Sequence, residues 1–227
     1  MKSVLLIVLL AFSAGASAQE ADEGYDRFIT ELAGESGIPA ADIEAVLARA
    51  ARQQSILDAI SRPAEAKPWR DYRPIFLNDA RVAGGLAFMR ENGALLARIE
   101  RETGVPASVV TAIIGIETSY GKITGSYRVV DALVTLGFHY PPRADFFRGE
   151  LKQLFFLANE EKSVDINQVK GSYAGASGWG QFIPSALLSY FVDEHGENHD
   201  IDPFSVEDTI FSIENYLHKN GLSKGNI

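Results

Sequence analysis

A glutamate stands at the end of an apolar run, where it could act as a general acid. Three apolar residues precede Glu117 at helical spacings of three, four and seven: Ile114, Ile113 and Val110. This spacing places them with Glu117 on the helix face that packs inward. A carboxyl held against isoleucines loses solvation, so its pKa rises and the protonated acid, which can donate a proton in catalysis, is favoured. The alternatives are a structural ion pair with Lys122 or Arg128, or simple exposure at the helix end.

A glycine-rich segment, residues 170–185, carries polar side chains next to an aromatic one. Its glycines let the backbone turn sharply and approach a ligand closely. Ser172 and Gln181 supply hydrogen-bond donors and acceptors, and Trp179 supplies a flat apolar face. Polar groups beside aromatic planes suit sugars. A tight connection that binds no ligand is the alternative.

No cofactor is expected from the sequence. The chain has no cysteine, which excludes disulfides, thiolate metal sites and a cysteine nucleophile. The acidic segment 193–203 has the side chains of a calcium loop at Asp193, His195 and Glu197. However, Asn198 stands where such loops need glycine, and Phe204 stands where they need a bidentate glutamate. A solvated loop is therefore favoured over calcium at Asp193–Glu197.

Helices are expected to position these residues, so the predicted fold class is all-α. Apolar spacings of three and four predict helices over the following ranges: 25–37, 39–60, 76–104 (as one helix or two), 105–118, 128–138, 143–161, 184–194 and 204–221. Three prolines in residues 61–74 predict a loop and a domain boundary. No strand pair is predicted. We expect an N-terminal helical segment over residues 19–66 and a catalytic core over residues 67–227.

The first residues have the form of a secretory signal. Lys2 precedes an apolar stretch, residues 4–12, and Ala16-Ser17-Ala18 predicts cleavage after Ala18. The stretch is too short to cross a bilayer, and no cysteine follows it to carry a lipid. We therefore expect residues 1–18 to be removed. The mature protein is expected in the periplasm, with no lipid anchor and no stable membrane insertion.

The overall charge limits the class of ligand. The formal net charge is −9, without a basic stripe along the chain. An acidic chain is a poor candidate for binding nucleic acid or an anionic membrane surface. An uncharged or mixed-charge ligand is therefore expected.

Three segments together point to a known family. They are PWRDYRPIF (68–76), GIETSYGKITGSYRVVDALVTLGFHYPPRADFFRGEL (115–151) and KGSYAGASGWGQFIPS (170–185). The family signature is a Glu-Thr pair at a helix end, followed later by Gly-x-Gly-Gln-Phe-x-Pro, which Gly178–Pro184 supplies. From about residue 67 to about residue 224, the chain resembles the lytic murein transglycosylase B family of the lysozyme-like superfamily. The resemblance implies a lysozyme-like helical core.

The resemblance also implies an activity and a set of site residues. Members cleave the β-1,4 bond between N-acetylmuramic acid and N-acetylglucosamine in peptidoglycan glycan strands, and they leave 1,6-anhydromuramyl ends. By position in the motifs, Glu117 matches the acid/base. The residues that match the sugar-binding groove are Tyr72, Ser172, Gln181 and Tyr216.

A single catalytic acid fits the sequence better than two. Glycosidases usually use a pair of carboxylates, but only Glu117 lies in an apolar helical context. Asp131, on the next helix, is expected on a polar face or in an ion pair. Two alternatives stay open: a muramidase that hydrolyses the same bond, and a non-catalytic peptidoglycan-binding protein. The second arises because members continue beyond the position of Ile227 with an Asn-x-Ser-x-x-Tyr-type segment that helps to close their cleft.

Overall fold

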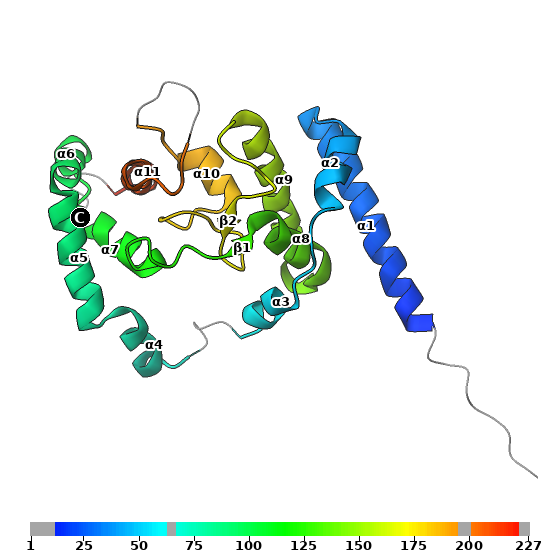
Figure 1. Ribbon diagram of the computed structural model, residues 1–227, viewed down its shortest axis with the longest axis horizontal. Coiled ribbons are helices and arrows are strands. Elements are labelled where there is room, and N and C mark those ends of the chain that lie inside the picture. The colour runs from blue at the N-terminus through cyan, green and yellow to red at the C-terminus, as the bar shows by residue number, and fades with distance from the viewer. Residues whose placement is uncertain (1–11, 63–66, 195–200, 223–227) are drawn as a thin grey trace, which may run out of the picture. The chain divides into compact units, whose positions relative to one another are not determined.

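The fold is almost entirely helical, which confirms the predicted class (Figure 1). The computed structural model describes residues 12–62, 67–194 and 201–222, with side chains from residue 23 onward. The chain divides into two compact units after Arg49. The second unit thus begins earlier than the boundary expected near residue 66, and it includes a helix that the sequence assigned to the N-terminal segment.

The first unit contains two helices, α1 (Phe12–Ser36) and α2 (Ala40–Leu47), which pack against each other. α1 ends where predicted, because Gly37 follows it with a φ of 71°, a left-handed conformation that stops a helix. Residues 12–18 of the expected signal segment belong to α1, and residues 1–11 lie outside the described residues. Signal cleavage after Ala18 stays a prediction.

The second unit is built mainly from helices. In chain order they are α3 (Gln54–Ile60), α4 (Trp69–Phe76), α5 (Asp79–Glu91), α6 (Gly93–Thr103), α7 (Ala107–Thr118), α8 (Val129–His139), the 3-10 turn η2 (Pro141–Arg143), α9 (Ala144–Glu160), α10 (Pro184–Tyr190) and α11 (Val206–Lys219). None of the helices in the described ranges combines the length and the apolar character needed to cross a membrane.

A two-residue strand pair, absent from the prediction, joins two distant segments of the second unit. β1 (Tyr127–Arg128) pairs antiparallel with β2 (Lys170–Gly171). Strands this short show no alternation of apolar and polar residues, so no sequence pattern could reveal them. The pair brings the start of the glycine-rich segment next to the connection that follows α7.

The predicted single helix over residues 39–60 is wrong, because residues 48–53 between α2 and α3 are not helical. Two backbone N–H groups in this stretch donate to side chains of α8. The Ala51 N–H donates to Asp131 Oδ1 at 2.9 Å, and the Gln53 N–H donates to Thr135 Oγ1 at 3.0 Å. These bonds to a distant helix replace the helical hydrogen bonds that the local pattern favours.

The loop predicted over residues 61–74 is wrong in its second half, because α4 occupies residues 69–76. Pro68 precedes the helix as its N-cap, and Pro74 lies near the end, where the helix stops within two residues. The pattern over residues 76–104 resolves into two helices, α5 and α6, which meet at Asn92.

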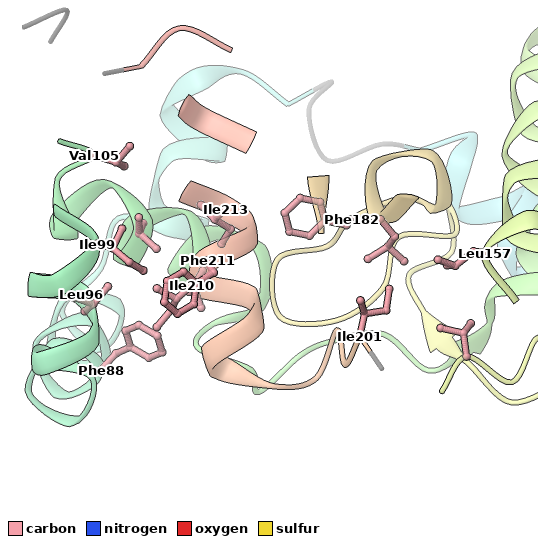
Figure 2. Close-up of a cluster of buried hydrophobic side chains, with 14 residues drawn as sticks. Phe88, Leu96, Ile99, Val105, Leu157, Phe182, Ile201, Ile210, Phe211 and Ile213 are labelled. Carbon is pink, nitrogen blue, oxygen red and sulfur yellow. The ribbon is translucent and has the colours of Figure 1, made fainter. Parts of the chain in front are cut away.

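The core of the second unit has two parts. Every residue of α8 from Val129 to Gly137 is buried, as expected for a helix that is apolar on all sides, and α8 packs along α9. A second cluster fills the space between α5, α6, α7, α10 and α11 (Figure 2). Its labelled members in Figure 2 include Phe88, Leu96, Ile99, Phe182, Ile210, Phe211 and Ile213. This cluster supports the end of α7, where the candidate acid lies.

Candidate active site

Glu117 lies in the last turn of α7, directly before an unusual reversal of the chain. Three consecutive residues after the helix adopt left-handed backbone conformations: Ser119 (φ 54°), Tyr120 (φ 61°) and Gly121 (φ 75°). Only glycine takes this conformation without strain, so the turn needs support from its surroundings. Because strained backbone clusters at active sites, the strain makes this helix end a candidate functional site.

Glu117 is exposed as a residue, which corrects the expectation that its side chain packs inward. Val110 and Ile114 on the same helix are fully buried, but the side chain in the last turn reaches solvent. Nearby protein atoms still desolvate the carboxyl, and this raises its pKa above the ordinary value for glutamate, as expected. None of the ion pairs among the described residues includes Glu117, and Arg128 pairs with Asp131 instead.

Thr118 fastens the end of α7 to the glycine-rich segment. Its side chain is 1% exposed. The hydroxyl donates to the carbonyl of Trp179 at 3.0 Å and accepts the N–H of Gly121 at 3.0 Å. The buried Thr118 side chain therefore satisfies the carbonyl of Trp179 in the glycine-rich segment and the N–H of Gly121 in the reversal. These two bonds hold Thr118, the residue next to Glu117, in place.

Two glycines allow the segments around Glu117 to come into direct contact. A Cβ atom on Gly121 would lie 2.3 Å from the ring of Trp179, so the indole packs directly on the backbone of the reversal. A Cβ atom on Gly178 would lie 2.1 Å from the carbonyl oxygen of Pro203. Both glycines also have positive φ values. In both cases the close approach is to other parts of the protein, so the expected close approach of this segment to a ligand stays a prediction.

Gln181 joins the glycine-rich segment to the loop after Glu117. Its backbone is left-handed, with a φ of 51°. Its Nε2 donates to the carbonyls of Thr124, at 3.1 Å, and Gly178, at 2.8 Å. Both hydrogens of the amide are then committed to the fold. A ligand can therefore engage this side chain through Oε1, which accepts a hydrogen bond from a hydroxyl or an N–H.

Ser172 lies beside the same loop. Its Oγ accepts the N–H of Ala176 at 3.1 Å and closes a tight turn, while its hydroxyl hydrogen is left to donate. A Cβ atom on Gly125 would lie 2.5 Å from the N of Ser172, so these two backbones touch. The structure thus brings Ser172 and Gln181 to the loop of residues 121–126 that follows Glu117.

Tyr72 and Tyr216 lie on other elements. Tyr72 is on α4, where its ring contacts Trp69 and Phe76 of the same helix, with centroids 6.2 and 5.1 Å apart. Tyr216 is on α11, 42% exposed, and packs edge-on against Tyr190 with centroids 5.0 Å apart. These contacts do not join either tyrosine to Glu117, so their place in a groove rests on the resemblance of their segments.

Two buried carboxylates near these elements, Asp131 and Glu150, accept hydrogen bonds within the fold. Asp131 is 4% exposed, forms an ion pair with Arg128 at 2.6 Å and accepts the N–H of Ala51. Glu150, on α9, accepts both the N–H and the hydroxyl of Ser185 at the start of α10. The expectation that Asp131 lies in an ion pair is confirmed. Asp208 and Glu214 of α11 also have raised pKa values and no ion pair among the described residues, but both are buried, whereas Glu117 is exposed.

The acidic segment considered for calcium falls partly outside the described residues, which omit residues 195–200. At its edge, Asp208 is buried and accepts the N–H groups of Glu194 and Asp202, at 3.4 and 3.3 Å. Burial raises the pKa of Asp208. Within the ranges that the structure describes, no group of three or more His, Cys, Asp or Glu side chains is arranged to hold a metal ion.

A cavity of about 710 Å³ lies behind the glycine-rich segment. Its lining includes Thr124 and Gly125 from the loop after Glu117, together with buried side chains of α9 such as Leu154 and Leu157. Glu117 is not among the described residues that line it. The candidate acid therefore lies outside this cavity.

Comparisons with known proteins agree with the helical core. Residues 20–227 match the transglycosylase SLT domain family. Membrane-bound lytic murein transglycosylase B of Escherichia coli is 35% identical over 209 residues, which make up 88% of this chain and 57% of that protein. The chain therefore spans little more than half the length of this relative.

Solved structures of similar proteins confirm the expected lysozyme-like fold. Soluble lytic transglycosylase SltB1 from Pseudomonas aeruginosa superposes with a TM-score of 0.83 and 46% identity, over 89% of this chain and 68% of that one. SltB3 from the same organism, in complex with NAG-NAM-pentapeptide, has a TM-score of 0.78 and 28% identity, over 90% of this chain and 54% of that one.

Proposed function

Because the chain belongs to the transglycosylase SLT domain family, we propose that it is a lytic transglycosylase of the bacterial cell wall. Its substrate is the β-1,4 bond between N-acetylmuramic acid and N-acetylglucosamine, and its product carries a 1,6-anhydromuramyl end. One observation carries the proposal. Glu117, with a raised pKa, stands on a braced helix end beside a glycine-rich segment that presents hydroxyl and amide groups.

A single carboxyl can perform both proton transfers of this reaction. Glu117 in its acid form protonates the glycosidic oxygen, and the bond from that oxygen to C1 of the muramyl residue breaks. The N-acetyl group of the same sugar stabilises the positive charge at C1. Glu117, now a carboxylate, takes the proton of the C6 hydroxyl, whose oxygen attacks C1. No water is consumed, and the carboxyl returns to its protonated form.

The neighbouring polar groups suit a sugar in this reaction. The free hydroxyl hydrogen of Ser172 can donate to the N-acetyl carbonyl, while Gln181 Oε1 can accept from a sugar hydroxyl or amide. Tyr72 and Tyr216 offer partly exposed rings for packing against pyranose faces. The complex of SltB3 with NAG-NAM-pentapeptide supports a glycan ligand for this chain.

Mass spectrometry of digested murein tests the proposal. Purified murein incubated with the wild-type protein should release muropeptides with anhydromuramyl ends, which are lighter by one water than reducing ends. Reducing ends without anhydro ends would show that the chain is a muramidase. Sedimentation of the protein with murein in the absence of any release would favour a non-catalytic binding protein.

We propose that the protein acts in the periplasm after export. The signal-like residues 1–18 support this, since murein lies outside the cytoplasmic membrane. N-terminal sequencing of the protein recovered from the periplasmic fraction should begin at residue 19. Recovery of a chain that still begins at Met1 from the cytosol would contradict export.

A further inference from the structure

The reversal after Glu117 is strained, and something must hold it. Ser119 and Tyr120 are both non-glycine residues in the left-handed region, with φ values of 54° and 61°. Non-glycine residues keep this strained conformation only where contacts with the surrounding structure hold them in it. Thr118 holds one side of the reversal through Trp179. The side that faces α5 is held by the ring of Tyr120.

Three helical glycines form a slot for this ring. A Cβ atom on Gly84 would lie 2.7 Å from the ring of Tyr120, and a Cβ atom on Gly85 would lie 2.7 Å from its Oη. On the other wall, a Cβ atom on Gly115 of α7 would lie 2.6 Å from the same Oη. Glycine weakens a helix interior, so three of them around one ring are explained by the space that the ring requires.

Hydrogen bonds close the slot at its inner end. The phenol donates to the carbonyl of Arg81 at 2.9 Å, and the guanidinium of Arg81 donates to the carbonyl of Gly115. Burial raises the pKa of Tyr120, so the phenol stays a donor across the physiological range. Phe88 lies against the ring, with centroids 5.8 Å apart. The ring is therefore fixed at its edge, its face and its hydroxyl, and it couples α5 to the end of α7.

We propose that Tyr120 is a positioning residue for Glu117, which it reaches through the backbone of the reversal. The inference rests on the proposed function, in which Glu117 is the acid/base. A ring displaced from the slot would let the left-handed turn relax. The last turn of α7 would then lose its fixed direction, and with it the carboxyl two residues before the turn. A small misplacement of a catalytic group is enough to slow the chemistry strongly.

A pair of variants can block and reopen the slot. Gly85→Ala adds a methyl group that collides with the Tyr120 hydroxyl, and Tyr120→Phe removes that hydroxyl. In the double variant the methyl group meets Cζ at 3.4 Å, an ordinary van der Waals contact. Gly149→Ala is the matched control, since a Cβ atom there meets nothing within 4 Å on a helix remote from the slot.

The first readout is the rate of muropeptide release. Gly85→Ala should lower kcat about tenfold or more, with a much smaller change in KM, while the Gly149→Ala control stays near the wild type. In the Tyr120→Phe background, the same Gly85→Ala change should lower kcat less than about twofold. Equal losses in the two backgrounds would overturn the proposal, and so would a kcat that Gly85→Ala leaves unchanged.

The second readout does not need activity. Carbon-13 NMR titration of the Glu117 carboxyl, assigned with Glu117→Gln, should show the raised pKa in the wild type and in the double variant. In Gly85→Ala the pKa should move toward the ordinary value, because the carboxyl gains solvent as the turn relaxes. If the pKa is the same in all variants while only the melting temperature falls, Tyr120 serves packing alone. If the wild type releases no muropeptides, the proposed function fails and this titration still decides the role of Tyr120.

Discussion

The hydroxyl of Thr118 should contribute far more to stability than that of a similar threonine on the same helix. Thr118→Val replaces the hydroxyl by a methyl group of nearly the same size, so shape is kept and hydrogen bonds are lost. Thr111→Val is the matched control. Thr111 is also buried on α7, at 4% exposed, but its hydroxyl donates only within its own helix, to the carbonyl of Ala107 at 2.7 Å.

The expected magnitude follows from the groups that lose a partner. Thr118→Val leaves the Trp179 carbonyl and the Gly121 N–H without the hydroxyl that now satisfies them. Each buried group left unpaired costs about 1–2 kcal/mol, so the free energy of unfolding should fall by about 2–4 kcal/mol. The carbonyl of Ala107 keeps its helical N–H donor, so Thr111→Val should cost about 0–1 kcal/mol.

Urea unfolding followed by circular dichroism measures both variants. The midpoint of Thr118→Val should shift strongly downward while the slope of the transition stays that of the wild type. Thr118→Ser keeps the hydroxyl and should recover most of the loss. Losses for Thr118→Val and Thr111→Val that agree within about 1 kcal/mol, near the uncertainty of the extrapolation, would refute the reasoning.

Three further predictions concern carboxylates. Glu117→Gln should raise the free energy of unfolding at neutral pH but not at acid pH. The reason is that a carboxyl whose pKa rises on folding destabilises the folded state as the pH increases through that pKa. A difference in urea unfolding that does not depend on pH would argue against this prediction. The cleavage rate should fall as pH rises through the same pKa, and a flat profile of kcat would show that Glu117 is not the acid. Asp131→Asn should cost about 2–4 kcal/mol, since the ion pair of the buried Asp131 with Arg128 is lost, yet retain cleavage. Complete loss of turnover in a folded variant would make Asp131 catalytic.

The local pattern predicted the elements whose hydrogen bonds are local. The helix that carries Glu117 was predicted over residues 105–118 and runs from Ala107 to Thr118, with Gly104 ending the helix before it. The break between α2 and α3 could not be predicted in this way, because it depends on Asp131 and Thr135, about eighty residues away.

The candidate site also has a part that the sequence predicted and a part that depends on contacts between distant residues. Residue type and position singled out Glu117, Ser172 and Gln181, and the structure places all three around one loop. The supporting roles of Thr118 and Tyr120 depend on contacts with other elements, so no spacing could show them. The one signal in the sequence is a set of glycines inside helices, at positions 84, 85 and 115, which indicates close approach by another part of the chain.

The most direct test of the central claim is the release of muropeptides by Glu117→Gln beside the wild type. The substitution keeps the size and hydrogen-bonding capacity of the side chain but removes the proton that the reaction needs. The account predicts that the wild type releases anhydromuropeptides and that Glu117→Gln, although folded and bound to murein, releases almost none. Equal release by the two proteins would contradict the assignment of Glu117 as the acid/base.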